Sequence, residues 1–335
     1  MESLLDKSYT YLINRRPFFE SGWGEQDAIS YFLREDPREF HLRRPANDIT
    51  LRWGPGRIQD TVTIREGWFE SPYHSVWDDG RYDYASPEMS QARIQMILPR
   101  PWKHNMPVVV HFAGTGDQGF ARRRIAMAMP LAERGIGSVI LENPFYGTRR
   151  PPDVNDVRLR EVSDMIRMLS AAVEEGIALV HRLKADGYGP LGVTGISMGG
   201  SVALTVAAQA GLPLAVGACV APHSASAVYL DGAFNQACAW DALNEDMPEG
   251  NAANRMRDLM DFWDIRNYPL PARPDATVLL GALRDSYIPR YSVEIVHEHW
   301  QGSSLKWIDT GHLGAFFFYR RNCYETVIEA FRRLG

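Results

Sequence analysis

Cysteine is scarce in this sequence, and positive charge is not in excess. The 335 residues include three cysteines, Cys219, Cys238 and Cys323, an odd number at wide spacing that suits reduced thiols better than a disulfide framework. The formal net charge of -5 and the isoelectric point of about 6.0 provide no basic field that would hold nucleic acid or an anionic membrane. We therefore expect a cytoplasmic protein with no nucleic-acid partner.

Long apolar runs and targeting signals are also missing. Glu2 and Asp6 stand where a secretory or organelle signal carries basic residues. The longest nearly apolar stretch, LPLAVGACVAP at 212–222, is far shorter than the roughly 20 residues that a helix needs to cross a bilayer. No internal repeat or low-complexity tract interrupts the sequence. These features predict one folded unit without a transmembrane segment.

Short apolar runs rich in β-branched residues do occur, and from residue 93 onward they alternate with helical patterns. Several runs are apolar throughout, which is typical of strands in a parallel sheet with helices on both faces. The sequence therefore predicts an α/β protein with a mostly parallel central sheet and right-handed crossovers. The expected strands are residues 93–99, 106–112, 137–143, 189–196, 214–222, 276–283 and 304–309.

Two of the helical patterns between these strands are long. Residues 121–134 predict a helix that Pro130 should kink. Farther along, apolar residues recur every three or four positions and predict a helix that packs one stripe on the sheet and ends by Gly187. We expect the whole stripe to lie in the core. Its members are Val162, Met165, Ile166, Leu169, Val173, Ile177 and Val180.

Two segments lie outside this alternation. Residues 1–58, helical and rich in aromatic residues, are expected to form an N-terminal extension packed on the core, and residues 59–335 the main domain. The segment 68–83 is expected to supply early strands or to cover a sheet edge. Residues 224–272 are too long for a plain connection between two strands and carry a helical pattern, so we expect a short helical cap there.

One short motif carries chemistry. Gly195, Ser197 and Gly199 form the pattern Gly-x-Ser-x-Gly; an expected strand leads into the serine, and a helical pattern leads out of it. A sharp strand-to-helix turn would strain the serine backbone, and glycine neighbours would let other segments approach it closely. This setting predicts that Ser197 is a nucleophile. The alternative is a glycine-rich turn with an incidental serine.

A serine hydroxyl is a weak nucleophile, so it needs a base and a carboxylate that orients the base. His312 follows the last expected strand, where a loop can carry an imidazole over the serine, and we predict that it is the base. Asp285 follows the preceding strand and gives the chain order serine, acid, histidine. The alternatives are His223 and His111 for the base, and Asp309 and Glu142 for the acid.

Negative charge that develops on a substrate carbonyl oxygen requires preorganised donors. The backbone N–H of Met198, directly after the serine, is one expected donor. The other is the backbone N–H of Thr115, because glycines in the segment 111–120 permit close backbone approach. The same segment lacks the lysine and the spacing of a phosphate-binding loop. We therefore expect an oxyanion hole and no cofactor.

The candidates for contact with a substrate are Arg122, Arg123, Tyr146 and His223. The two arginines open an expected helix, where the helix dipole disfavours cations. They therefore either face an anionic substrate group or pair with Asp117, Glu142 or other acids. The histidines of the tripeptide 297–299 occupy a predicted helix on which neighbouring positions point apart, so no metal site is expected.

Several motifs together resemble the α/β-hydrolase domain-containing protein 18 family. They are HFAGTGD with RRR, LENPFYG, GYGPLGVTGISMGG, RDSYIPR and TGHLGAFFF, in this order, with SGWG, GWFESP and ARIQMILPRPW upstream. The resemblance covers nearly the whole chain, including the N-terminal extension. It implies an α/β-hydrolase fold with Ser197, Asp285 and His312 at the triad positions. One departure is that eukaryotic relatives carry a long polar insertion before the strand that bears the acid, whereas this chain has only the short cap.

Together these features predict a serine hydrolase that cleaves a carboxylic ester through an acyl-enzyme intermediate. An esterase or lipase-like enzyme is the leading hypothesis, with a small-molecule or lipid ester as the partner and an acyl lipid as one candidate. The same triad supports an amidase or peptidase. A binding scaffold that kept the serine turn but lost its activity is the non-enzymatic alternative.

Overall fold

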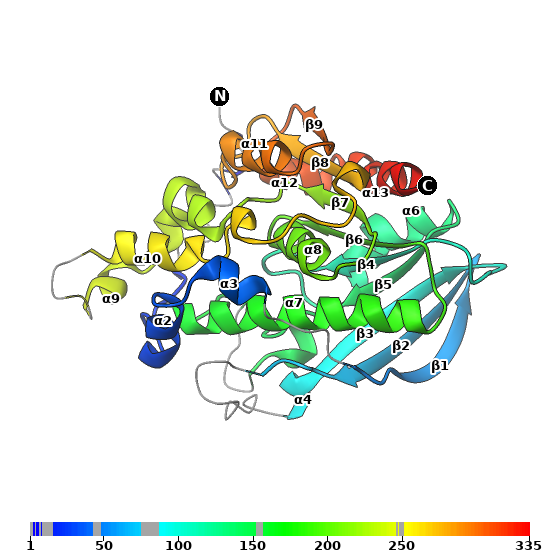
Figure 1. The fold of residues 1–335 in the computed structure, drawn as a ribbon, viewed down its shortest axis with the longest axis horizontal. Coiled ribbons are helices and arrows are strands. Elements are labelled where there is room, and N and C mark those ends of the chain that lie inside the picture. The colour runs from blue at the N-terminus through cyan, green and yellow to red at the C-terminus, as the bar shows by residue number, and fades with distance from the viewer. Residues whose placement is uncertain are drawn as a thin grey trace.

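The structure, a computed structural model, describes residues 3, 5, 6, 8, 16–42, 48–74, 87–151, 157–245, 247 and 251–335. Within them, one nine-stranded sheet crosses the molecule, with helices on both faces (Figure 1). Its strands are β1 (Arg52–Gln59), β2 (Val62–Glu70), β3 (Gln91–Pro99), β4 (Val108–Phe112), β5 (Gly137–Leu141), β6 (Leu191–Ile196), β7 (Ala215–Cys219), β8 (Thr277–Ala282) and β9 (Ser304–Ile308).

The strand order is β1-β2-β3-β5-β4-β6-β7-β8-β9. Every pair from β5 to β9 in this order is parallel, whereas β1, β2 and β3 join the sheet through antiparallel pairs. All seven strands expected from residue 93 onward are present, and the mostly parallel sheet is confirmed. The carboxyl ends of the parallel strands meet at one edge, so the loops after β4, β6, β8 and β9 lie close together.

Two helical layers enclose the sheet. Helices α7 (Val162–Ala185), α8 (Met198–Gln209) and α11 (Arg290–His299) share one core cluster, and α6 (Met129–Ala132) and α13 (Arg320–Leu334) pack into the clusters on the other face (Figure 1). The remaining α-helices are α2 (Gln26–Phe32), α3 (Pro37–Leu42), α4 (Pro87–Ser90), α5 (Ala121–Arg123), α9 (Trp240–Glu245), α10 (Ala252–Asp261) and α12 (His312–Phe317). The π-helical turns are Arg124–Ala128 and Ala227–Asp231, and the 3₁₀ turns are Gly147–Arg149, Ala233–Ala237, Ile265–Asn267 and Pro274–Ala276.

Helix α7 carries the apolar stripe that the sequence predicts. Six of its seven members are buried in the core, as expected. Leu169 differs, because it is only partly buried. Its side chain faces a cavity beside the sheet rather than solid core, and this cavity is part of the site described below.

The expected helix over 121–134 is divided. It begins as α5, widens into a π-helical turn at Arg124–Ala128 and continues as α6. Pro130 lies near the start of α6, where its missing N–H removes one hydrogen bond of the ladder. The wider turn before it accommodates that loss, so the proline interrupts the helix in the way the sequence suggests.

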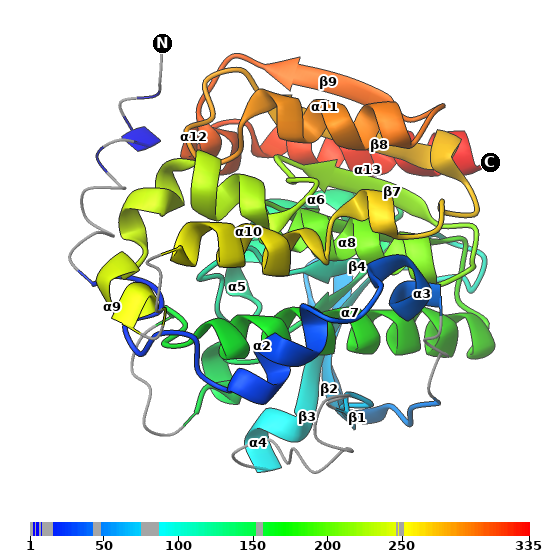
Figure 2. The ribbon, with the colours of Figure 1, turned by 60° about the vertical axis from the view of Figure 1, so that its left-hand side comes forward.

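The N-terminal extension packs against the cap. The ring centroids of Phe32 and Phe262 lie 5.0 Å apart, and the Trp23 indole donates a hydrogen bond to the Leu243 carbonyl at 2.8 Å. Figure 2 shows α2 and α10 on this side of the molecule. Strand β1 crosses the expected boundary at residue 58, so part of the extension belongs to the sheet.

The edge of the sheet agrees in part with the expectation for residues 68–83. Trp68 lies in β2, so this segment does supply an early strand. Residues 75–83 lie outside the described part of the chain. In the part that is described, every helix is too short or too polar to span a membrane.

Candidate active site

Ser197 occupies a strained turn between β6 and α8. Its backbone angles are φ 58° and ψ −126°, a combination that residues other than glycine rarely adopt. Such strain persists only where the surrounding structure enforces it, and it is concentrated at functional sites. The turn presents the serine at the carboxyl edge of the sheet, directly before the first turn of a helix.

Glycine is required on both sides of this turn because other backbone lies too close for a side chain. A Cβ atom at Gly195 would come within 2.1 Å of the Gly199 carbonyl group, and one at Gly199 within 2.4 Å of the Phe112 carbonyl oxygen. Alanine at Gly199 would push the serine turn away from β4, and alanine at Gly195 would push the first turn of α8 away from β6. The two glycines of the Gly-x-Ser-x-Gly pattern are therefore required by the close packing of the backbone.

Asp285 and His312 form a hydrogen-bonded pair. His312 Nδ1 lies 2.8 Å from Asp285 Oδ2, and the side chains are 12% and 2% exposed. The backbone N–H groups of Tyr287 and Ile288 both donate to Asp285 Oδ1 at 2.8 Å, which fixes the carboxylate. Because a carboxylate only accepts hydrogen bonds, the His312 proton sits on Nδ1 and the accepting lone pair on Nε2.

The charge state of His312 reflects opposing influences. Burial by itself lowers its pKa, but the Asp285 carboxylate and, more weakly, the Asp6 carboxylate raise that pKa above its ordinary value of 6.5. The Tyr287 ring lies against the imidazole, with centroids 5.2 Å apart. The imidazole is thereby a stronger base than a free histidine.

Sequence reasoning did not place Asp6 at this site. Its buried carboxylate accepts hydrogen bonds from the backbone N–H groups of His312 at 2.8 Å and of Leu313 at 3.1 Å. The sequence offers no signal for such a contact, because the partner groups are main-chain and lie about 300 positions away.

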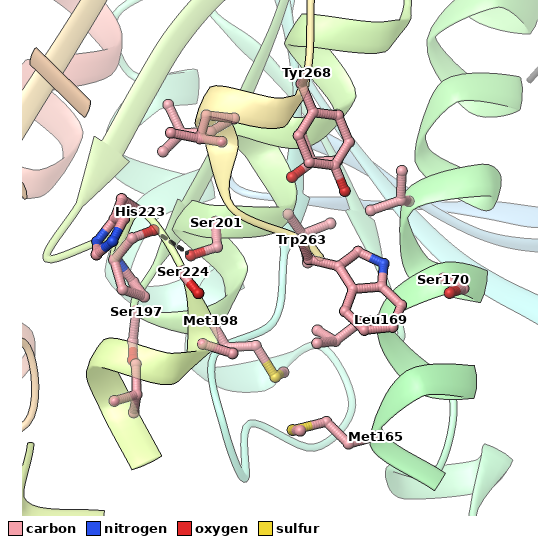
Figure 3. Close-up of a pocket in the computed structure, with 18 of the residues that line it drawn as sticks. Met165, Leu169, Ser170, Ser197, Met198, Ser201, His223, Ser224, Trp263 and Tyr268 are labelled. Carbon is pink, nitrogen blue, oxygen red and sulfur yellow. Dashed lines mark hydrogen bonds between the residues drawn. The ribbon is translucent and has the colours of Figure 1, made fainter. Parts of the chain in front are cut away.

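Two cavities meet at Ser197. The wide cavity, of about 400 Å³, is lined by Thr115, Arg122, Ser197, His312 and Phe317 among others. The narrow cavity, of about 90 Å³, is mostly apolar. Figure 3 shows Ser197 and His223 on one side of the narrow cavity, and Leu169, Ser170 and Trp263 on the other. Ser197 therefore borders both cavities, and His312 lines the wide cavity with it.

The expected oxyanion donors lie beside the serine. Met198 opens α8, where the first backbone N–H groups have no helical carbonyl to bond. Thr115 lines both cavities, and its hydroxyl contacts the Met198 sulfur at 3.9 Å. A Cβ atom at Gly114 would come within 3.0 Å of the Ile196 carbonyl oxygen, so this loop lies directly against the end of β6.

Arg123 takes the second of its two expected roles. Its buried guanidinium pairs with Asp117 at 2.8 Å and donates to the carbonyl oxygens of His111, Leu141 and Gly119. Burial raises the pKa of Asp117 and lowers that of Arg123, while the pairing opposes both shifts. Arg123 therefore braces the loop after β4. Arg122 is exposed at the wide cavity.

The other two substrate candidates lie in different surroundings. His223 lines the narrow cavity and is fixed by Ser292, whose Oγ lies 2.7 Å from Nδ1. Burial lowers the pKa of His223. Tyr146 is buried, and burial raises its pKa to about 12, although a hydrogen bond from the Gly116 backbone lowers it. Among the described residues, those lining the two cavities do not include Tyr146.

The alternative bases and acids are engaged elsewhere. Burial, and then the charge of Arg123, lower the pKa of His111 to about 3, and its Nε2 lies 2.9 Å from Ser138 Oγ. Glu142 accepts hydrogen bonds from Thr148, and Asp309 pairs with Arg284 at 2.9 Å. In the described part of the chain, no group of three or more His, Cys, Asp or Glu residues could hold a metal ion.

Comparison with known proteins bears on the whole fold. Residues 16–256 and 249–333 match the family model described as "Alpha/beta hydrolase domain containing 18". The solved acetyl xylan esterase 1 of Thermoanaerobacterium sp. JW/SL YS485 aligns with a TM-score of 0.60 at 14% identity, over 99% of this chain and 100% of that chain.

Two further solved structures are similar. An acetyl xylan esterase from Paenibacillus sp. R4 has a TM-score of 0.57 at 13% identity, over 93% of this chain and 99% of that chain. Est1E from Butyrivibrio proteoclasticus has a TM-score of 0.51 at 14% identity, over 72% of this chain and 95% of that chain. These similarities and the sheet described above confirm the expected α/β-hydrolase fold.

Proposed function

The chain belongs to the alpha/beta hydrolase domain containing 18 family, and from this premise we propose that it is a serine hydrolase that cleaves carboxylic esters. One observation carries the proposal. His312, hydrogen bonded to Asp285, lines the same cavity as Ser197, which stands in a strained turn between β6 and α8. Nucleophile, base and orienting acid are the three parts that acyl transfer needs.

The proposed reaction proceeds through an acyl-enzyme. His312 Nε2 takes the proton of the Ser197 hydroxyl as the serine oxygen attacks the ester carbonyl, and Asp285 stabilises the imidazolium that forms. The N–H groups of Met198 and Thr115 bind the oxyanion. His312 then protonates the departing alcohol, and water activated by the same histidine releases the acid.

The two cavities suggest how the ester is oriented. The leaving alcohol must receive its proton from His312, and His312 lines the wide cavity. The alcohol part is therefore placed in the wide cavity and the acyl part in the narrow one. Arg122, at the wide cavity, would attract an alcohol part that carries negative charge.

The walls of the narrow cavity support an apolar acyl group. They include Leu169 from α7, Met198 from α8, and Trp263 and Tyr268 from the cap. Both ends of α8 contribute lining residues. We take an ester with an apolar acyl group, such as an acyl lipid, as the substrate class. That similar solved structures are named esterases agrees with an ester as the substrate.

Labelling with a fluorophosphonate probe, beside turnover of matched ester and anilide substrates, tests the function. We expect the wild-type protein to be labelled and to cleave esters faster than anilides. Ser197→Ala should abolish labelling and reduce kcat by roughly 10⁴-fold or more. The exposed serine variant Ser21→Ala should be labelled like the wild type.

Two results would contradict the proposal. A folded wild-type protein that is neither labelled nor active would be a binding scaffold. Faster cleavage of anilides than of matched esters would make it an amidase or peptidase that uses the same three residues.

A further inference from the structure

Asp6 joins the two loops that carry the acid and the base. Its Oδ2 accepts hydrogen bonds from the backbone N–H groups of Ser286 at 3.2 Å and of His312 at 2.8 Å. Its Oδ1 accepts from the N–H of Leu313 at 3.1 Å, and the Tyr287 hydroxyl donates to its carbonyl oxygen at 3.4 Å. One carboxylate therefore accepts hydrogen bonds both from Ser286, the residue after Asp285, and from His312.

These bonds satisfy backbone N–H groups that have no hydrogen-bond acceptor within their own helix. His312 and Leu313 open α12, a helix of six residues, and the first N–H groups of a helix have no intrahelical acceptor. Hydrogen bonds from N–H groups to a carboxylate are charge-assisted and stronger than bonds to a neutral acceptor. Asp6 therefore lies at the N-terminal end of α12.

Gly311 gives independent support for a built contact. Its φ of −88° suits any residue, so its own backbone does not require glycine. A Cβ atom there, however, would lie 2.3 Å from Ser3 Cβ and 2.6 Å from Asp6 Oδ2. Glycine at this position therefore leaves space for the Asp6 segment, immediately before His312.

We propose that Asp6 is a positioning residue for the hydrolysis, holding the loops of Asp285 and His312 in register. The proposal rests on the proposed function. Asp6 contacts His312 through the backbone N–H and acts through the geometry of the Asp285 and His312 pair. Productive alignment of such groups is worth on the order of a hundredfold in rate when a displacement of about 1 Å is avoided.

The charge of Asp6 provides a readout that packing alone would not change. The groups that face His312 are the carboxylates of Asp285 and Asp6 and the ring of Tyr287, while Arg122 and the Arg123 and Asp117 pair line the same cavity. Replacing the Asp6 carboxylate with a neutral amide removes one influence that raises the pKa of His312. The pH below which activity is lost should therefore move down.

The experiment compares Asp6→Asn with the wild type in the full-length chain. The rate of fluorophosphonate labelling and kcat/KM for a neutral ester are measured from pH 5 to 9, with thermal unfolding as a check on folding. We expect Asp6→Asn to lose about tenfold to a hundredfold in kcat. The acid limb of its pH profile, the range in which activity falls as pH is lowered, should lie at lower pH than that of the wild type.

Two further variants complete the test. Asp258→Asn removes one exposed charge from α10 and should leave the rate and the acid limb unchanged. Gly311→Ala keeps Asp6 but displaces its carboxylate, so it should reproduce both the loss of rate and the shift of the acid limb. It keeps the proposal testable even if Asp6→Asn fails to fold.

The outcomes separate this proposal from the proposed function. If Asp6→Asn keeps the wild-type rate and the wild-type acid limb, Asp6 has no positioning role, and the proposed serine hydrolase activity still stands. Where Asp6→Asn does not fold, the same result in Gly311→Ala leads to the same conclusion. A similar loss in Asp258→Asn would also overturn it, because the effect would then be one of net charge. A wild-type protein that is neither labelled nor active overturns both proposals.

Discussion

The protonation of His312 controls the proposed reaction at the scale of single residues. Only a neutral imidazole can accept the serine proton, so activity is lost as pH falls through the pKa of His312. That pKa is raised, because the charges of Asp285 and Asp6 outweigh the effect of burial. We therefore expect the acid limb of the kcat/KM profile for a neutral ester to lie above pH 6.5.

Asp285→Asn is the control for this pH profile. The amide leaves the geometry nearly unchanged but removes the negative charge and favours the wrong tautomer, so kcat should fall by roughly 10⁴-fold. The residual acid limb should move to lower pH. A wild-type acid limb at or below pH 6.5 would show that burial, and not the carboxylates, dominates at His312.

The sequence predicts some of these residues and not others, for physical reasons. Ser197 is found because a strand and a helix flank it, and Asp285 and His312 because the chain order places them after the last two strands. The structure brings Asp285 and His312 into contact, whereas their catalytic roles stay predictions. Asp6 could not be found, since side-chain bonds to distant backbone leave no local pattern.

At the scale of elements, α7 forms one wall of the narrow cavity. Leu169 is the least buried member of its apolar stripe and faces that cavity. A tryptophan there would fill space that a long acyl chain needs. We expect Leu169→Trp to lower the ratio of kcat/KM for long-chain over short-chain esters by about tenfold, the effect of roughly 1.4 kcal/mol of lost binding.

The matched control is Leu270→Trp, a change at a residue that is 55% exposed. It adds the same side chain outside the cavity and should leave the chain-length preference unchanged. An unchanged preference in Leu169→Trp would place the acyl chain elsewhere, with the wide cavity as the remaining candidate.

The elements that the sequence predicts best are those with a regular apolar pattern. The central parallel strands are buried and mostly apolar, so the sequence predicts them, whereas it places most of β1 in a helical extension. Its sequence contains Gly54, Pro55 and Gly56, which normally indicate a turn. Strand β1 tolerates them because it lies at the sheet edge, is largely exposed, and shifts register between Trp53 and Gly56.

At the scale of the whole molecule, buried polar contacts connect distant segments, and the periodicity of the sequence does not predict these contacts. The Trp23 indole of the extension donates to the Leu243 carbonyl of the cap, Asp6 bonds the loops of the proposed acid and base, and the Arg149 side chain joins the loop after β5 to α7. Each contact depends on residues far apart in the sequence. Periodicity therefore predicts the layers but not these cross-links.

The pair of Arg149 and Glu175 is the most buried of these cross-links, with both side chains 0% exposed. Arg149 donates two hydrogen bonds to the Glu175 carboxylate, at 2.8 and 2.6 Å, and others to the carbonyl oxygens of Met89 and Glu142. Removing one partner leaves an uncompensated buried charge. We expect Arg149→Met and Glu175→Leu each to lower the free energy of unfolding by about 3–5 kcal/mol.

The double variant distinguishes a costly lone charge from a stabilising pair. If the cost of each single change is mostly the charge left behind, Arg149→Met with Glu175→Leu should lose far less than the sum of the singles, measured by urea unfolding. Arg182→Ala, which removes a partly exposed partner of Asp186, should change stability by no more than about 0.5 kcal/mol. Additive losses in the double variant would mean that Arg149 and Glu175 stabilise the fold through separate contacts, with Met89 and Glu142 on one side and Ser71 on the other.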